Sequence, residues 1–167
     1  MNKVDETGLT PLMLAATSSS SMNTIVVYLL MKAGANVNGS GYGGKTPLFI
    51  AVKKGAFSMV AFLAEKGADL NAEDTFGNGL LHESVSTGQI RVFEWLLSKG
   101  VDVNKKNSNQ VTPLIIAALQ NQVALVDLLL ASGADANLQD KAGNSALNLA
   151  RVQGFDSVIR SLISVTK

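Results

Sequence analysis

The chain has 167 residues, of which 47% are apolar and 16% charged, with a formal net charge of +1. The apolar share is large enough to build a core, which excludes an intrinsically disordered chain. The near-neutral charge argues against a dedicated nucleic-acid binder, because such proteins usually carry a basic excess. The absence of cysteine excludes disulfides, thiolate metal sites and thiol nucleophiles, and it leaves the redox compartment open.

No segment of the sequence has the features of a membrane span or of a secretion signal. The longest apolar run, Ile25–Met31, is much shorter than the ~20 residues that cross a bilayer. The first residues lack the apolar centre of a signal peptide, although a leader already removed would leave no trace. We therefore expect no membrane contact, and a protein that is either cytoplasmic or exported to a compartment such as the periplasm with its leader removed.

The sequence repeats with a period of 33 residues, which three independent series share. One series consists of glycines that open Gly-Ala-Asn-Val-Asn and related segments: Gly34, Gly67, Gly100 and Gly133. A second series consists of isolated turn-forming residues: Gly55, Gly88, Asn121 and Gly154. A third opens Thr-Pro-Leu or a related triplet: Thr10, Thr46, Gly79, Thr112 and Ser145, where only the first interval is longer. One period in three series indicates a repeat protein.

Each repeat is predicted to contain two short helices. Thr followed by Pro is typical of a helix start, because the Thr hydroxyl caps backbone N–H groups and Pro fits the first turn. The Gly or Asn of the second series accepts the left-handed conformation that follows a helix. A second, amphipathic helix follows, for example Val123–Ala131, and the next glycine ends it. The polar loop after it contains periodic aspartates that we expect to be turn residues: Asp69, Asp102 and Asp135.

This unit of helix, turn, helix and hairpin-like loop resembles the ankyrin repeat over essentially the whole chain. The resemblance implies an all-α solenoid in which stacked repeats bury one another's apolar faces. It also implies a single ankyrin-repeat domain covering residues 1–167. We expect five repeats, at residues 5–40, 41–73, 74–106, 107–139 and 140–167.

Three repeats depart from the common pattern. The first is three residues longer within Thr17–Asn23, which we interpret as a tolerated loop insertion rather than an adapted contact loop. The third has Gly79-Leu80 in place of Thr-Pro, and we expect Gly79→Thr with Leu80→Pro to raise the melting temperature. The last helix, within Phe155–Val165, has an apolar and a polar face, which is typical of a C-terminal cap.

One segment matches the pattern of a phosphate-binding loop. Gly39–Thr46 has the spacing Gly, four residues, Gly-Lys-Thr. That motif requires a buried strand before it, whereas Ile25–Lys32 is predicted to be a helix. The repeat itself also supplies Gly44 and Thr46. Nucleotide binding through Gly39–Thr46 is therefore kept only as an alternative.

The single histidine, His82, lies where ankyrin repeats commonly carry a histidine that braces neighbouring loops. The resemblance implies the same structural role here. A lone histidine is a poor metal site, and its neighbour Glu83 does not face it on a helix. Because no nucleophile, base and oxyanion site can be assembled, we expect a protein that is not an enzyme and that needs no metal or cofactor.

Ankyrin arrays are protein-binding scaffolds, so the resemblance implies another protein as the partner. Loop tips and the exposed side of the first helices would form an extended concave binding surface. Mapping the ankyrin pattern onto this sequence gives the candidate partner-binding residues Leu9, Tyr42, Lys45, Lys53, Lys54, Phe76, Asn78, Ser86, Thr87, Asn109, Val111, Leu119, Gln120, Asn144 and Val152. Tyr42 and Phe76 are the predicted anchors, because exposed aromatic residues often dominate an interface.

The small size of the array favours a binder that inhibits or sequesters its partner and is monomeric when unbound. A cysteine-free chain rich in Ser, Asn and Gln also leans towards a bacterial protein. A self-associating structural module, which pairs through an incompletely capped first repeat, remains the alternative.

Overall fold

The computed structural model describes residues 2–165 and separates the chain into two compact parts, Met1–Thr75 and Phe76–Lys167. The described residues of the first part form α1 (Pro11–Ala15), α2 (Ser21–Lys32), a short 3-10 turn (Tyr42–Gly44), α3 (Pro47–Lys53) and α4 (Phe57–Glu65). Those of the second part form α5 (Leu80–Ser86), α6 (Ile90–Ser98), α7 (Pro113–Leu119), α8 (Val123–Ala131), α9 (Ala146–Gln153) and α10 (Asp156–Ile163).

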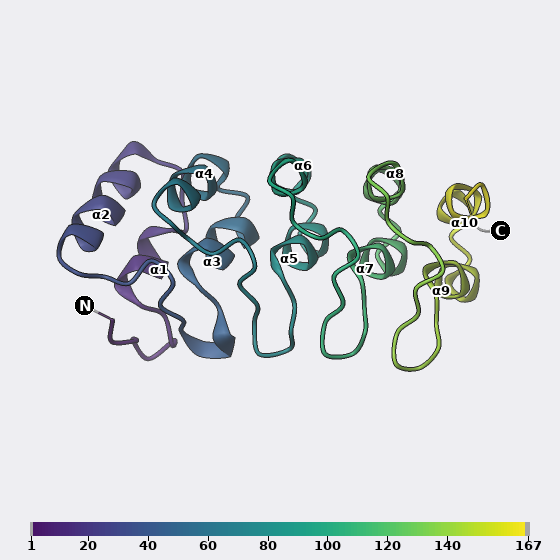
Figure 1. Cartoon of the computed structure of the whole chain (residues 1–167), viewed down its shortest axis with the longest axis horizontal. Helices are drawn as coiled ribbons and strands as arrows, with labels where there is room; N and C mark the ends of the chain where they lie inside the picture. Colours follow the sequence, from purple (N-terminus) through teal and green to yellow (C-terminus); the bar gives the residue numbers. More distant parts are fainter. Residues whose placement is uncertain (1, 166–167) are drawn as a thin grey trace. The chain divides into compact units, whose positions relative to one another are not determined.

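Consecutive helices pack in pairs, and the pairs stack within each part. In the first part α1 packs on α2, α3 packs on α4, and α1 also contacts α3. In the second part α5 packs on α6, α7 on α8 and α9 on α10, while α7 contacts both α5 and α9. Figure 1 shows that the first helix of each pair lies next to the hairpin-like loops and the second helix lies away from them. This arrangement confirms the predicted all-α solenoid of helix–turn–helix units joined by hairpin-like loops.

The predicted helix starts are confirmed by capping hydrogen bonds. The side-chain oxygens of Thr10, Thr46, Thr112 and Ser145 each accept a hydrogen bond from the backbone N–H three residues later, at 3.2–3.3 Å. Pro follows each of the three threonines at the first helical position. Local side-chain chemistry therefore fixes where the first helix of these pairs begins.

The turn between the paired helices is also as predicted. Asn121 has a φ of 55° at the position where Gly55, Gly88 and Gly154 have φ values of 62–71°. Asn is the residue that tolerates this left-handed conformation best after Gly. The aspartates of the loops that follow the second helices are turn residues, as expected, because Asp69, Asp102 and Asp135 each accept a hydrogen bond from the backbone N–H two residues later.

The apolar core of each part is built by the paired helices. Phe49 and Met59 are fully buried in the first part, and Phe93, Leu114 and Leu129 are fully or almost fully buried in the second. Complete burial of a side chain of this size contributes about 1.5–3 kcal/mol to folding. The core is thus made of the positions that recur with the sequence period.

The interpretation of the three extra residues of the first repeat as a loop insertion is only partly right: the connection at residues 16–20 is longer than that at residues 54–56, but α2, with 12 residues, is also longer than α4, with 9. Helix α2 begins at Ser21, and α4 begins at Phe57. The residue 33 positions before Phe57 is Thr24, so α2 begins three residues earlier in its repeat than α4 does. Ser20 caps α2 by accepting a hydrogen bond from the backbone N–H of Asn23 at 3.1 Å. The insertion therefore adds about one turn to the start of α2.

The C-terminal helix has the predicted two faces, with one exception. Val158 and Leu162 are buried, and Phe155 and Ile159 are half-buried. Ile163 was expected on the apolar face, but half of its surface is exposed. The helix α10 ends at Ile163, so this residue lies at the last turn, where less of the neighbouring helix is available to cover it.

We expect Gly79→Thr alone to raise the melting temperature by about 1 °C, since a Thr cap is worth a few tenths of a kcal/mol more than Gly. Gly79 has extended backbone (φ −85°, ψ 179°) and a Cβ there would make only ordinary contacts, at 3.6 Å from the Lys105 side chain. Leu80, however, is completely buried, so Leu80→Pro would remove core contacts and reverse the gain. Calorimetry of the single and double variants measures both effects, and a lower melting temperature for Gly79→Thr would contradict the capping argument.

Candidate functional site

Some of the candidate partner-binding residues lie at the ends of the first helices, and the others lie on hairpin-like loops, most of which are closed by backbone hydrogen bonds. In the first part the N–H of Asp5 donates to the Leu9 carbonyl and that of Gly41 to the Lys45 carbonyl, both at 2.9 Å. In the second part Asn107 and Val111, and Asp140 and Asn144, are paired in the same way at 3.0 Å. Each loop therefore has a defined tip of three residues.

A side-chain acceptor at the start of the loop fixes most of these tips. Asp140 Oδ1 accepts hydrogen bonds from the backbone N–H groups of Ala142 and Asn144, each at 2.9 Å. Asp5 and Asn107 accept equivalent pairs of N–H groups. Gly41 takes the place of this acceptor in the second loop, which instead forms the 3-10 turn Tyr42–Gly44.

Neighbouring loops are also joined through their backbones. The N–H of Tyr42 donates to the Gly8 carbonyl at 2.8 Å in the first part. In the second part the N–H of Ser108 donates to the Phe76 carbonyl, and that of Lys141 donates to the Asn109 carbonyl, both at 2.9 Å. Backbone order of this kind lowers the conformational entropy that is lost when a partner binds.

His82 joins the start of α5 to the next loop, which confirms its expected structural role. It is buried, its Nδ1 accepts a hydrogen bond from the Gly79 N–H at 3.1 Å, and its Nε2 lies 3.0 Å from the Val111 carbonyl oxygen. These partners assign the neutral tautomer with the proton on Nε2. The ring therefore accepts the N–H of the residue before the helix, which is one half of a capping box, and it also holds the loop that carries Val111.

In the first part, the most exposed candidate is Tyr42, of which 84% is accessible. Leu9 and Lys45 are half-buried, and the Lys45 ammonium lies 5.5 Å from the centre of the Phe49 ring. Lys53 and Lys54 are exposed at the end of α3. The structure thus exposes one aromatic residue at a loop tip and two lysines at the end of α3.

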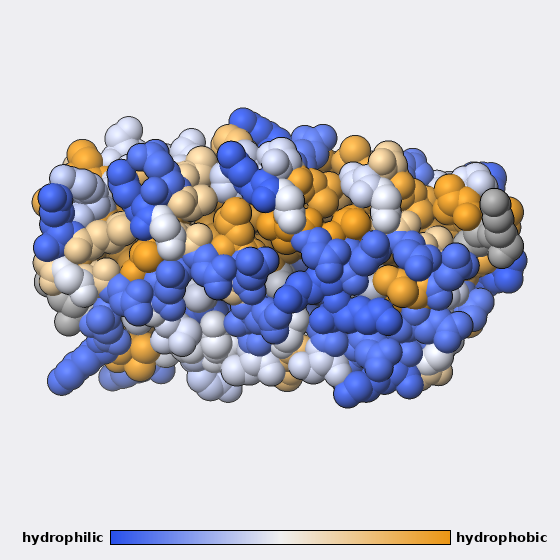
Figure 2. Space-filling model, in the orientation of Figure 1, coloured by the Kyte–Doolittle hydropathy of each residue, from blue (hydrophilic) through white to orange (hydrophobic). Residues whose placement is uncertain are grey.

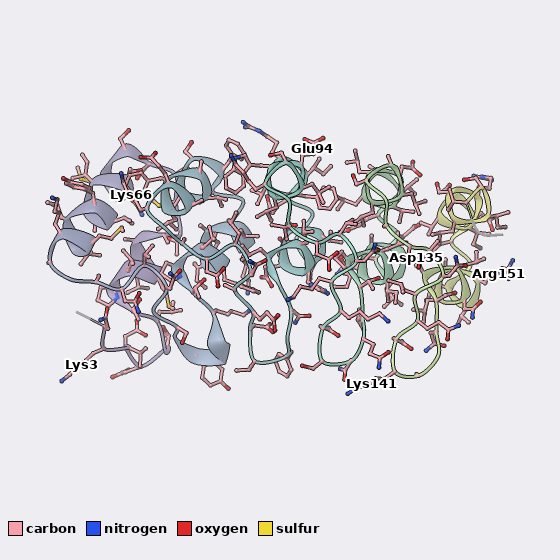
Figure 3. The ribbon with its side chains drawn as sticks, viewed as in Figure 1. Lys3, Lys66, Glu94, Asp135, Lys141 and Arg151 are labelled. Carbon is pink, nitrogen blue, oxygen red and sulfur yellow. The ribbon has the colours of Figure 1, made fainter. Side chains whose placement is uncertain are left out.

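In the second part, the exposed apolar candidates are Phe76, Leu119 and Val152. Phe76 is 67% exposed in a loop, and Val152 is 81% exposed near the end of α9. Leu119 at the end of α7 is exposed to a smaller extent. The polar candidates that are exposed beside them are Ser86, Asn109 and Gln120. Figure 2 shows that the surface around the loops is mostly hydrophilic, and Figure 3 shows Lys141 at a loop tip.

Three polar candidates of the second part make side-chain hydrogen bonds inside the loops and helices, and a fourth candidate is apolar and partly covered. Asn78 Oδ1 accepts a hydrogen bond from the Asn107 amide at 2.8 Å, and the Asn144 amide donates to Asp140 Oδ2 at 3.3 Å. The Thr87 hydroxyl donates to the Glu83 carbonyl, and Val111 is half-buried. These side chains support the loops, and their contribution to partner binding remains a prediction.

The segment that matches a phosphate-binding loop lacks the required surroundings. Helix α2, and not a strand, precedes it, as the sequence predicted. The N–H of Gly41 donates to the Lys45 carbonyl, and that of Gly44 donates to the Gly41 carbonyl. These N–H groups therefore bond within the turn instead of converging on an anion. Among the described residues, no group of three or more His, Asp or Glu side chains could hold a metal ion either.

Asp140 is expected to make the stability depend on pH in the acid range. The backbone N–H of Asn144, with smaller contributions from its amide and from Ala142, holds the pKa of Asp140 below its ordinary value of 3.8. Because the pKa is lower in the folded state, the carboxylate stabilises the fold above the unfolded pKa, and this stabilisation is lost as the pH falls through the folded pKa.

Asp140→Asn should therefore be less stable than the wild type at neutral pH, by a margin that shrinks below about pH 4. The variant should fold, because Asn107 holds the equivalent loop with an uncharged amide. Urea unfolding of both proteins across the acid range measures the margin, and a margin that does not change with pH would contradict the role of the charge.

Sequence reasoning missed one exposed surface, on the outer side of α2. Met22, Ile25, Val26 and Leu29 are exposed there, although apolar residues in a helix of a repeat are normally taken as core. Their spacing, with intervals of three and four residues, was the available signal.

A family model for three copies of the ankyrin repeat matches residues 1–74 and 78–167. The match covers nearly the whole sequence, and the chain belongs to the ankyrin-repeat family. Ankyrin repeats generally mediate protein–protein interaction, and the family is typically a non-enzymatic binding scaffold. The comparison with curated proteins gave no match.

In the described part of the chain, no helix has both the length and the apolarity needed to cross a membrane. The single domain and the five repeat boundaries remain predictions.

Proposed function

We propose that this protein is a non-enzymatic scaffold that binds another protein through its loop tips and the ends of its first helices, and that inhibits or sequesters that partner. The observation that carries the proposal is that the Tyr42 side chain is exposed while its backbone is held in place. Its side chain is 84% exposed, while its backbone is fixed by a 2.8 Å hydrogen bond to Gly8. A large aromatic residue on an ordered backbone has the properties of an interface anchor.

Phe76 supports the same proposal in the second part. Its side chain is 67% exposed, and its carbonyl accepts the Ser108 N–H at 2.9 Å. Val152 adds a second exposed apolar residue at the end of a first helix. Inhibition would follow if this surface covered the functional face of the partner, because the partner's own ligands could then no longer reach that face.

Affinity capture from extracts of the source cell tests this proposal, with wild type compared with the variant Tyr42→Ala/Phe76→Ala. The matched control is Glu94→Ala, because Glu94 is exposed and projects from the outer helix α6 (Figure 3). We expect one protein to be enriched by wild type and control and lost with the double variant. With the purified partner, the double variant should bind at least about tenfold more weakly, since truncation of an anchor costs about 2 kcal/mol.

Unchanged affinity of a folded double variant would show that the anchors are assigned wrongly. The single variants then separate the two parts, because Tyr42 lies in the first and Phe76 in the second. The partner's own activity, titrated with the wild type, tests inhibition. A partner that stays fully active at saturation would exclude inhibition while leaving the scaffold role intact.

A further inference from the structure

Helix α2 carries an apolar stripe on its outer side, formed by Met22, Ile25, Val26 and Leu29 and called here the N-terminal stripe. These four side chains are between 39% and 69% exposed. Their spacing of three, four and seven residues from Met22 places them on one face of the helix. The stripe is thus a continuous apolar ridge and not a scatter of single exposed residues.

The same position is buried elsewhere in the array. When the period is applied, Val26 corresponds to Met59 in the first part and to Leu125 and Val158 in the second. All three are buried. Val26 is therefore a core-type position that is left 39% exposed by the described residues of the first part.

Helix α2 is apolar on both sides. Val27, on the inner side, is completely buried, and the outer side carries the stripe. A helix that is apolar all round is typical of one that is covered on all sides. The extra turn at the start of α2, which contains Met22, lengthens the apolar ridge beyond what the repeat requires.

We propose that the N-terminal stripe is covered by the same stripe of a second copy of this chain, so that the protein forms a closed, two-fold symmetric dimer. Ser21–Met31 contains no charged residue, so no like charges meet when two identical faces pack across a two-fold axis. Lys32 and Glu65 are charged at the matching last position of α2 and α4, but the outer helices α6 and α8 of the second part also expose a charged residue at their centres, Glu94 and Asp127, where α2 has Tyr28. This difference singles out α2 as the surface for self-association.

Helix α10, the last helix of the second part, exposes Ile163 but has no apolar stripe that could match the one on α2. Helix α10 exposes Asp156, Ser157 and Arg160. Placing the stripe against this polar face would bury charged groups without partners, which is costly. A head-to-tail contact, which would continue into a filament, is therefore disfavoured relative to the closed dimer.

The size of the stripe is compatible with a dimer. Helix α2 has 12 residues and is about 18 Å long. Together with the exposed side chain of Leu14, the stripe presents on the order of 500 Å² of surface, most of the ~800 Å² per partner of a standard interface. The dimer replaces the expectation of an unbound monomer, and it leaves the loop tips available to the partner proposed above.

Sedimentation of the full chain over a range of micromolar concentrations tests the dimer. We expect the wild type to reach twice the monomer mass. Ile25→Glu should weaken self-association at least about tenfold, because a charge would face its own copy across the axis. Ile163→Glu is the matched control, because Ile25 and Ile163 are equally exposed isoleucines, and it should leave the dimer unchanged. Leu29→Glu provides a second variant, and circular dichroism verifies that each protein is folded.

A wild type that stays monomeric at the highest soluble concentration would overturn the proposal and leave the stripe to a different partner. A dimer that survives both Ile25→Glu and Leu29→Glu would overturn the placement of the interface. A mass that keeps growing beyond the dimer would overturn the closed symmetry. The outcome is separate from that of the capture experiment, which depends on Tyr42 and Phe76.

Discussion

His82→Phe is expected to lower the free energy of unfolding by about 2–3 kcal/mol, although the new side chain is larger and more apolar. The reason is the loss of two hydrogen-bond partners. The Gly79 N–H and the Val111 carbonyl both bond to the His82 ring, and a buried polar group left without a partner costs about 1–3 kcal/mol. Steric conflict is not the cause, because Phe49 is fully buried at the matching position of another repeat.

Urea unfolding followed by circular dichroism measures this effect. His82→Gln is the informative control, because its amide retains one acceptor and one donor near the two ring nitrogens. We expect His82→Gln to recover part of the loss. If His82→Phe were as stable as the wild type, the brace between the start of α5 and the Val111 loop would contribute nothing to folding.

The sequence predicted the helix pairs because their boundaries depend on local chemistry. A Thr hydroxyl at the start, as at Thr112, and a residue that accepts positive φ at the turn, as at Asn121, act within four residues along the chain. Such interactions are visible in the sequence. Each of these local signals recurs in successive repeats with the same 33-residue spacing. This recurrence is why the fold class could be assigned from the sequence alone.

The added turn of α2 could not be predicted in the same way. The serines before and at its start are typical of a loop, and Ser21–Asn23 becomes helical because Ser20 caps the helix and the Asn23 amide donates to the Ala15 carbonyl at 2.8 Å. That last bond joins α1 to α2, so it exists only once the two helices have packed. The sequence shows the three additional residues but not the contact that orders them.

The sequence predicted which residues belong to the candidate site, but it could not predict how exposed each of their side chains is. Tyr42 and Val152 are highly exposed, as expected, whereas Leu9 and Val111 are half-buried. The apolar stripe of α2 was missed for a related reason. Whether Val26 is core or surface depends on what lies against it, and its own neighbours in the sequence do not carry that information.

Gly41→Asp is expected to destabilise the protein by about 2 kcal/mol, even though it restores the acidic residue found at this position in other loops. Asp5 and Asp140 accept backbone N–H groups there, so a repeat-based design would choose Asp. A Cβ at position 41, however, would press on the Gly8 carbonyl oxygen and lie 2.9 Å from the Met13 sulfur. The loop around Tyr42 must therefore move away from Gly8 to accommodate any side chain.

Asn107→Asp is the matched control, since Asn107 already has a side chain at the equivalent position and bonds to its own loop. Asn107→Asp loses the hydrogen bond that the Asn107 amide donates to Asn78 Oδ1, so we expect the control to cost about 1 kcal/mol, which is less than the cost of Gly41→Asp. The same pair of variants tests the function, because displacing the 41–45 loop moves Tyr42 and should weaken partner binding, whereas Asn107→Asp leaves Tyr42 in place. A Gly41→Asp variant that unfolds at the wild-type urea concentration would show that the loop shifts freely. In that case the ordered backbone of Tyr42 could not be the reason that it acts as an anchor.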